Sequence, residues 1–440
     1  MVFQRPALVA GLTALMLSVP ATALAQPATT SPAPTRTALT TVWQQIHQVR
    51  GLPEPAWLKT GTSRTATRMA PVSGAYQGAL EGVSSVPSST RAWAVGVECA
   101  SGCGTSAEVD DTLVLHYDGT SWNASASLNP SATFNELTSV KALSDTNVWA
   151  VGDYCAANCG TTTEVDDTLV LHWDGSSWKQ FTSKNPSASL NVLTSVTAAS
   201  SSDVWAAGLK CNSGCTRLLT LTEHWNGSSW SNISSPSPSS TYNVLTGVSS
   251  FPTHKAWAAG SNGSKTLVLR WTGTKWASVS SPNPSSASNA LAGVSASSAS
   301  NAWAVGAYGS SVAHTLALHW NGTKWSKVST PNPSSALNVL EGVAARTGSD
   351  AWTVGMYCKS ACGQLTEADS PLIVHWNGSS WSRKAANFSG TGFAALYAVS
   401  AHSGTNAWAV GAACSANCGT TSEVDSTLIE HWNGTSWAVS

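Results

Sequence analysis

The chain has 440 residues, a formal net charge of −1, and only 10% charged side chains. A surface that binds nucleic acid needs clustered Lys and Arg, so this composition argues against nucleic acid as a partner. The chain also contains 22 Trp and 10 Cys. Together these features are typical of a neutral, β-rich, extracellular protein.

Residues 1–26 are predicted to form a secretory signal peptide. Arg5 supplies the positive charge, Leu8–Val19 the short apolar core, and Ala23-Leu24-Ala25 a small-residue cleavage site. The apolar run is too short to span a bilayer comfortably. We therefore expect a secreted protein without membrane insertion.

Residues 27–75 are predicted to be a linker and a short N-terminal extension. Pro27–Ala38 is rich in Pro, Thr and Ala and cannot build a core. Within 41–51, Val42, Ile46 and Val49 recur at helical spacing, which predicts one short helix. Ser63–Ala70 is a candidate strand that would complete the last repeat from outside.

Residues 76–440 contain one phrase seven times: an apolar run ending in an aromatic residue, a turn with Gly, and a Trp. Thr168–Trp178, which reads TLVLHWDGSSW, is representative. An Asp-Gly or Asn-Gly pair between β-rich runs is a strong hairpin signal, because both residues tolerate positive φ. An L-x-x-V run and a W-x-x-G run precede each copy, as at Leu80 and Trp93.

Four short strands in a repeat of about 50 residues are the sequence mark of a propeller blade. We therefore predict an all-β fold, a seven-bladed β-propeller with four-stranded antiparallel blades. Burial of each blade between two neighbours explains why both faces of the strands are apolar.

All cysteines fall into five C-x3-C pairs. The pairs are Cys99/Cys103, Cys155/Cys159, Cys211/Cys215, Cys358/Cys362 and Cys414/Cys418. An even count in an exported protein predicts disulfides, and each would rigidify one small loop.

The repeats resemble the kelch-type repeat of galactose-oxidase-like propellers. Val95-Gly96, Tyr117-Asp118 and Trp122 match that motif in the first repeat, as do Val151-Gly152, Trp173-Asp174 and Trp178 in the second. The resemblance implies a propeller fold and says little about activity. Galactose oxidase holds copper with Tyr and His and carries a Tyr–Cys crosslink. In this chain every cysteine belongs to a C-x3-C pair, so none is left for such a crosslink.

Six repeats carry a His before the aromatic residue of the third strand, and the fourth repeat has Arg270 instead. The six are His116, His172, His224, His319, His375 and His431. Equivalent positions on separate blades lie far apart, so we interpret these His and the repeated Trp as structural. The non-repeating His254, His314 and His402 are scattered, and we predict no catalytic residue and no metal centre.

Four repeats follow the C-x3-C loop with an acidic phrase. The residues are Glu108, Asp110 and Asp111; Glu164, Asp166 and Asp167; Glu367 and Asp369; Glu423 and Asp425. We interpret them as solvated residues or as partners of backbone N–H groups, with calcium as the alternative. The Asn-Gly-Ser/Thr phrases at Asn226, Asn321, Asn377 and Asn433 match a glycosylation sequon, but the turn requires Asn-Gly in any case.

The C-x3-C loops and the inter-blade PNPSS loops (Pro282–Ser286, Pro331–Ser335) are expected on one face of the propeller. Loops fastened by a disulfide, here called stapled loops, would project from that face in blades one, two, three, six and seven. Blades four and five, with loops at Ser261–Lys265 and Ala307–His314, would leave a gap.

The hypothesis for function is a secreted, non-catalytic binding or scaffold module, a monomer that recognises an extracellular glycan or protein through the stapled face. The alternatives are a secreted carbohydrate-active enzyme on the same scaffold and a purely structural surface protein.

Overall fold

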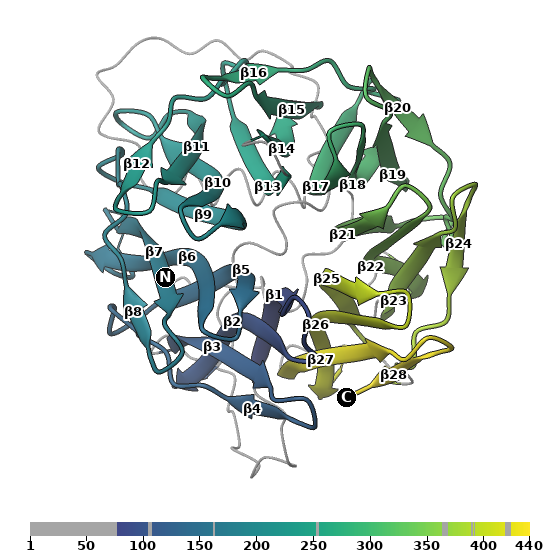
Figure 1. Cartoon of the computed structure of the whole chain (residues 1–440), viewed down its shortest axis with the longest axis horizontal. Coiled ribbons are helices and arrows are strands. Elements are labelled where there is room, and N and C mark those ends of the chain that lie inside the picture. The colour runs from purple at the N-terminus through teal and green to yellow at the C-terminus, as the bar shows by residue number, and fades with distance from the viewer. Residues whose placement is uncertain are drawn as a thin grey trace.

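Seven four-stranded antiparallel sheets stand around a central axis in the computed structural model (Figure 1). The structure describes residues 77–440 apart from 104–107, 162, 252–254, 363–367, 389, 391 and 419–423. The described residues form strands and turns and no helix, so the predicted all-β seven-bladed propeller is confirmed. The signal peptide, the helix at 41–51 and the strand at Ser63–Ala70 lie outside the described residues.

Each blade is one continuous stretch of chain, and its strands run in sequence order from the axis to the rim. Blades 1 and 2 comprise β1 (Gly78–Ser85), β2 (Ala92–Ser101), β3 (Val109–Tyr117), β4 (Trp122–Ala124), β5 (Asn135–Ser144), β6 (Asn147–Ala157), β7 (Val165–Trp173) and β8 (Trp178–Gln180). Blades 3 and 4 comprise β9 (Asn191–Ser200), β10 (Asp203–Cys211), β11 (Leu218–Trp225), β12 (Trp230–Asn232), β13 (Asn243–Phe251), β14 (Lys255–Asn262), β15 (Lys265–Trp271) and β16 (Trp276–Ser278).

The remaining three blades follow the same plan. Blades 5 and 6 comprise β17 (Ser288–Ser298), β18 (Asn301–Gly309), β19 (Ala313–Trp320), β20 (Trp325–Val328), β21 (Asn338–Thr347), β22 (Asp350–Ser360), β23 (Ala368–Trp376) and β24 (Trp381–Lys384). Blade 7 comprises β25 (Ala394–Ser403), β26 (Asn406–Ala416), β27 (Val424–Trp432) and β28 (Trp437–Val439). No helix in the described ranges is long and apolar enough to cross a membrane.

The Asp-Gly and Asn-Gly phrases form the turn between the third and fourth strands, as predicted. In blade 1, Asp118 Oδ1 accepts the N–H groups of Thr120 at 2.8 Å and Ser121 at 2.9 Å. Gly119 adopts a φ of 108°, which a residue with a side chain rarely tolerates. The short side-chain oxygen and the glycine therefore fix the hairpin locally.

The Gly of the W-x-x-G run lets the two inner strands of a blade pair closely. A Cβ added at Gly96 would lie 1.9 Å from the carbonyl oxygen of Ala79. The innermost strand also has a bulge opposite this glycine, between Leu80 and Gly82 in blade 1. The bulge recurs in all seven blades and leaves one unpaired residue in each, at Glu81, Thr138, Thr194, Thr246, Ala292, Glu341 and Tyr397.

Aromatic triads form the contacts between neighbouring blades. Trp93 of β2 packs against Trp173 and Trp178 of blade 2, with ring centroids 5.3 and 5.4 Å apart. The same arrangement recurs from blade to blade, which accounts for most of the tryptophans. The second-strand Trp residues are therefore fully buried core, as predicted, whereas Trp122, Trp173, Trp271, Trp376 and Trp432 are half-buried.

The seventh triad closes the ring. Trp408 of β26 packs against Tyr117 and Trp122 of blade 1, at 4.7 and 5.1 Å. The backbone N–H of Ser85 also bonds the hydroxyl of Ser400 at 2.9 Å. Blade 7 takes all four described strands from its own repeat. Side-chain packing, the Ser85–Ser400 bond and an isolated antiparallel bridge between Gln77 and Ser426 join the first and last blades.

Candidate binding face

The connections between the second and third strands lie on one face of the propeller, together with the connections between blades. In blade 2, the N–H of Cys155 bonds the carbonyl of Phe134, which ends the connection from blade 1, at 3.1 Å. The hydroxyl of Ser131 lies 3.9 Å from the Sγ of Cys159. We call the side formed by both kinds of connection the stapled face.

Five disulfides occupy this face. The structure joins Cys99–Cys103, Cys155–Cys159, Cys211–Cys215, Cys358–Cys362 and Cys414–Cys418, with Cα–Cα distances from 4.7 to 5.8 Å. The first cysteine of each pair lies in the second strand of its blade, and the second lies in the connection that follows. Each disulfide therefore fastens the base of one connection.

Blades 4 and 5 lack these loops and have short connections instead. Only Gly263 and Ser264 separate β14 from β15, and only Ser310–Val312 separate β18 from β19. We call the region over these two connections the notch. The gap predicted from the distribution of cysteines is therefore present on the stapled face.

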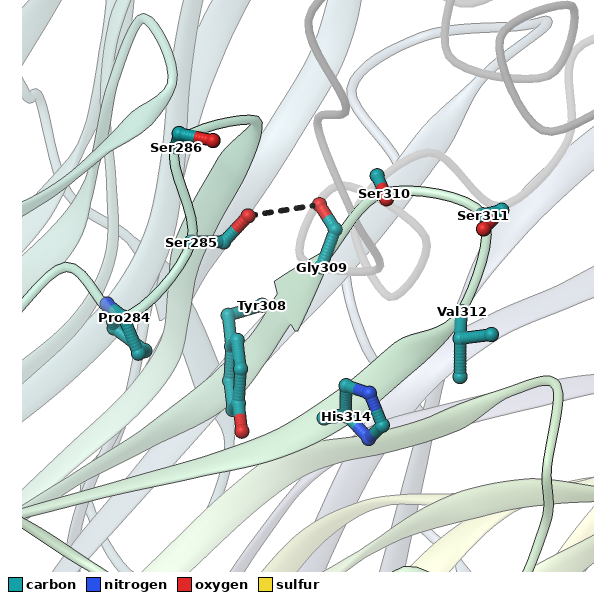
Figure 2. Close-up of a pocket in the computed structure, with 9 residues that line it drawn as sticks. All are labelled: Pro284, Ser285, Ser286, Tyr308, Gly309, Ser310, Ser311, Val312 and His314. Atoms are coloured by element: carbon teal, nitrogen blue, oxygen red, sulfur yellow. Dashed lines mark hydrogen bonds between the residues drawn. The ribbon is translucent and has the colours of Figure 1, made fainter.

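An open pocket of about 450 Å³ lies in the notch (Figure 2). It is lined by Pro284, Ser285, Ser286, Tyr308, Gly309, Ser310, Ser311, Val312 and His314. The side chains of Tyr308 and His314 point to the same side of the blade, with ring centroids 5.3 Å apart (Figure 2). The Nζ of Lys327 donates to the Tyr308 hydroxyl at 2.7 Å and lies 4.1 Å from its ring centroid. The pocket thus combines aromatic rings and hydroxyls, and a lysine outside its lining contacts one of the rings.

The gap could be predicted from the distribution of cysteines, but the residues that line the pocket could not. His314 was interpreted as one of several scattered histidines, and Tyr308 was not singled out. The available signal was their pairing: the two residues stand directly opposite each other across the shortened β18–β19 connection.

The acidic phrases lie at the bases of the stapled loops. Asp110 stands opposite Cys99, and Asp166 opposite Cys155, across the second and third strands. Glu164 accepts the N–H of Gly160 at 2.6 Å, so this carboxylate binds its own loop as one interpretation predicted. In blades 1 and 2 the carboxylates of the Glu and the Asp lie within 4.8 Å of each other and of the disulfide sulfur of Cys99 or Cys155. Calcium stays the alternative interpretation of these carboxylates; Glu367 and Glu423 lie outside the described residues.

The repeated histidines stack on the tryptophan of the second strand, and five of them bond a neighbouring Asn or Asp. In blade 2, for example, His172 Nε2 bonds Asn147 Oδ1 at 2.9 Å, and the ring lies 4.3 Å from Trp149. The same bond occurs at His224, His319, His375 and His431. Burial lowers the pKa of His172, which favours the neutral ring. These histidines are structural, as predicted.

His116 is the exception, because its Nε2 does not have the Asn or Asp partner of the other five rings. Blade 1 has Arg91 where blades 2 and 5 have Asn147 and Asn301, and Arg91 pairs with Asp145 at 3.1 Å instead. His116 Nε2 is buried without a hydrogen bond to any described residue. Burial, and then the charge of Arg91, lower the pKa of His116.

A cluster of titratable groups on the axis was missed altogether. Glu341, Tyr397 and Glu81 are the bulge residues of blades 6, 7 and 1, which are neighbours around the ring. Both carboxyl side chains are buried, and Glu81 Oε1 has no hydrogen bond within the described ranges. Burial, and then the charge of Glu341, raise the pKa of Glu81 to about 8. Enclosure, and then the nearby charge of Glu81, raise the pKa of Tyr397 well above its usual range.

The axial cluster breaks the symmetry of the repeat. In blades 2, 3 and 4 the bulge residue is Thr, and its hydroxyl donates to a carbonyl of the next blade, as from Thr138 to Leu193 at 2.7 Å. Burial of a carboxyl at this position favours its protonated form, as at Glu81, whose pKa is raised to about 8.

Comparisons with known proteins assign no family. No protein-family profile and no curated protein match the chain. Solved structures that resemble it include YCF48 bound to a D1 peptide (14% identity, 80% of this chain and 93% of that one, TM-score 0.46). Others are YCF48 from Cyanidioschyzon merolae (13%, 82% and 97%, 0.46) and U3-55K (9%, 80% and 96%, 0.48). With TM-scores below 0.5, these similarities say nothing about what this chain binds.

Proposed function

We propose that this chain is a secreted, non-catalytic propeller that binds an extracellular glycan or protein in the notch of its stapled face. The observation that carries the proposal is the pocket at Tyr308 and His314, which lies where two neighbouring blades lack the stapled loop. A concave site with aromatic walls and several convergent polar groups is the usual form of a ligand site. Rigid loops beside it reduce the ordering cost of binding.

Export and a monomeric state belong to this proposal. The N-terminal signal, the even number of cysteines and the five disulfides support an oxidising compartment. The kelch-type resemblance of the repeats is retained as a proposal about their kinship. N-terminal sequencing of the exported protein should find a mature end close to Ala25.

The notch can be filled without altering the rest of the propeller. In the test variant, Cys155–Asp166 of blade 2 replaces Gly309–Ala313 of blade 5, because both segments join equivalent strands. A matched control replaces the turn Asn321–Lys324, between the third and fourth strands, with Asp174–Ser177. Binding to an array of oligosaccharides and peptides should disappear in the first variant and persist in the second.

Equal binding by the notch-filled and control proteins would show that the site lies elsewhere. The fold of both variants is checked by circular dichroism and thermal unfolding, so that a misfolded variant is not counted as loss of binding. Release of soluble products from a polysaccharide would contradict the non-catalytic part of the proposal.

A second candidate is a carbohydrate-active enzyme, which the axial cluster favours. A glycosidase usually uses two catalytic carboxyl groups with different pKa values. Glu81, which has a raised pKa, lies beside Glu341. Both side chains are buried at 8% and 6% exposure, which places them out of reach of a polysaccharide. Non-catalytic binding is therefore the first proposal. If the protein released soluble products from a polysaccharide, and Glu81→Gln and Glu341→Gln abolished that release, the enzyme would become the first proposal.

A further inference from the structure

Charge divides the stapled face into two regions. Blades 6, 7, 1 and 2 carry carboxylates near their stapled loops, at Asp369, Asp425, Glu98, Glu108, Asp110, Asp111, Glu164, Asp166 and Asp167. No Asp or Glu occurs in the sequence between Glu223 and Glu341, a stretch that contains all of blades 4 and 5. The notch therefore lies in the part of the ring without acidic side chains.

Two exposed lysines bring positive charge to the notch. Lys265 is the first residue of β15, directly opposite Asn262 across the two-residue connection. Lys327 lies in β20 and reaches the hydroxyl of Tyr308 in the pocket. Lys210 and Arg217 of blade 3 extend the positive region on one side. An anionic ligand is attracted to this region and repelled by the blades around it, which confines the ligand to the notch.

Among anionic ligands, the lining of the pocket favours an acidic sugar. Ser285, Ser286, Ser310 and Ser311 line the same pocket as Tyr308 and His314, and the Ser285 hydroxyl donates to the carbonyl of Gly309 at 3.4 Å. Hydroxyls exchange hydrogen bonds with sugar hydroxyls, and aromatic rings pack against the apolar face of a sugar ring. A nucleic acid would need many more basic side chains along its backbone than this notch provides.

We infer that the notch binds a carboxylated oligosaccharide, a short uronate-containing segment of a polysaccharide. The sugar ring packs at Tyr308 and His314, and its carboxylate pairs with Lys327, while the next acidic sugar faces Lys265. This inference rests on the proposed function, because it names the class of ligand for the same notch.

The test uses the whole chain and defined probes. An oligogalacturonate is titrated by calorimetry beside a neutral galactan of equal length, at low and high salt. We expect the oligogalacturonate to bind at least about tenfold more tightly, with an affinity that falls as salt screens the pairs. Lys265→Gln and Lys327→Gln should each weaken binding by roughly three- to tenfold.

The chain provides a matched control for each substitution. Lys275 lies in the β15–β16 turn of blade 4 and Lys324 in the β19–β20 turn of blade 5, away from the stapled connections. Lys275→Gln and Lys324→Gln make the same change in net charge and should leave the affinity unchanged. Equal losses in all four variants would show that only the overall charge acts, which overturns the inference.

Other outcomes separate this inference from the proposed function. If the neutral galactan or a peptide binds as tightly, and only the notch-filled variant loses it, the notch remains the site and the carboxylate preference is wrong. If double-stranded DNA bound more tightly than the oligogalacturonate, the ligand would be a phosphate polymer and the inference of an acidic sugar would be wrong. No binding of the oligogalacturonate at all overturns the inference directly.

Discussion

His116 shows how one substitution in a repeat leaves a buried nitrogen without a partner among the described residues. Elsewhere the equivalent ring bonds an Asn or Asp at the start of the second strand, as His431 bonds Asn406 at 3.0 Å. In blade 1 the partner position is Arg91, whose ion pair with Asp145 is about half exposed. An exposed ion pair contributes little, whereas an unsatisfied buried nitrogen costs about 1 to 3 kcal/mol.

Arg91→Asn should therefore stabilise the propeller. The new amide would give His116 Nε2 the partner that Asn147 gives His172, for a gain of about 1 kcal/mol in the free energy of unfolding. Urea unfolding measures the change. The reverse substitution, Asn147→Arg, serves as the matched control and should destabilise blade 2. A loss of stability in Arg91→Asn would show that the pair with Asp145 is worth more than the histidine bond.

At the scale of elements, the stapled connections and the strands differ in what holds them. Cys155 and Cys159 close a loop of only a few residues, and such a crosslink removes little entropy from the unfolded chain. Trp149 lies in the same strand, β6, as Cys155; its side chain is 2% exposed and packs against Trp225 and Trp230 of blade 3. The tryptophan therefore stabilises the fold as a whole, whereas the disulfide orders only its own connection on the stapled face.

Replacing both Cys155 and Cys159 with Ser should lower the free energy of unfolding by roughly 2 kcal/mol or less. Trp149→Ala removes a buried indole and should cost about 3 to 5 kcal/mol. Thermal unfolding compares the two variants, and hydrogen exchange should show faster opening confined to residues 155–166 in the first. If the cysteine variant unfolds as readily as the tryptophan variant, the disulfide has a global role.

The strands could be predicted from the sequence, and the residues on the axis could not. Repeated pairs such as Trp173 and Trp178 fix the hairpin, the blade and the number of blades, because the same local chemistry recurs seven times. Glu81, Glu341 and Tyr397 occupy the variable position in L-x-x-V, where nothing in one repeat reveals a bulge. Their proximity comes from closing the ring, which brings blades 6, 7 and 1 together. The pocket was hidden for a similar reason, since it needs a loop from one blade and two strands from the next.

The whole ring contains several buried glutamates whose ionisation works against folding. Burial raises the pKa of Glu81 to about 8, and also raises the pKa values of Glu223 and Glu430 to about 7. In the unfolded chain these groups titrate near 4.5. At low pH each carboxyl is protonated in both states. As the pH rises above 4.5 the unfolded chain releases its protons first, so the stability of the fold decreases until the folded pKa is passed.

We therefore expect the melting temperature to fall between about pH 5 and pH 8, and Glu81→Gln to reduce this fall. The amide keeps the shape of the protonated acid but cannot ionise. At pH 8.5 the variant should be more stable than the unmodified protein by roughly 2 kcal/mol, since each pKa unit corresponds to about 1.4 kcal/mol and solvent relaxation reduces the full effect.

Asp118→Asn is the matched control for this measurement, because Asn replaces Asp in the same turn of blades 3, 5, 6 and 7. The hydroxyl of Thr120 and the N–H of Ser121 hold the pKa of Asp118 below its usual range, so its contribution is lost at acid pH instead. The control should change the acid limb of the melting curve and leave the alkaline limb in place. An alkaline limb that is the same in Glu81→Gln and in the unmodified protein would mean that the axial carboxyl ionises without cost. In that case water, or a cation on the axis, solvates it.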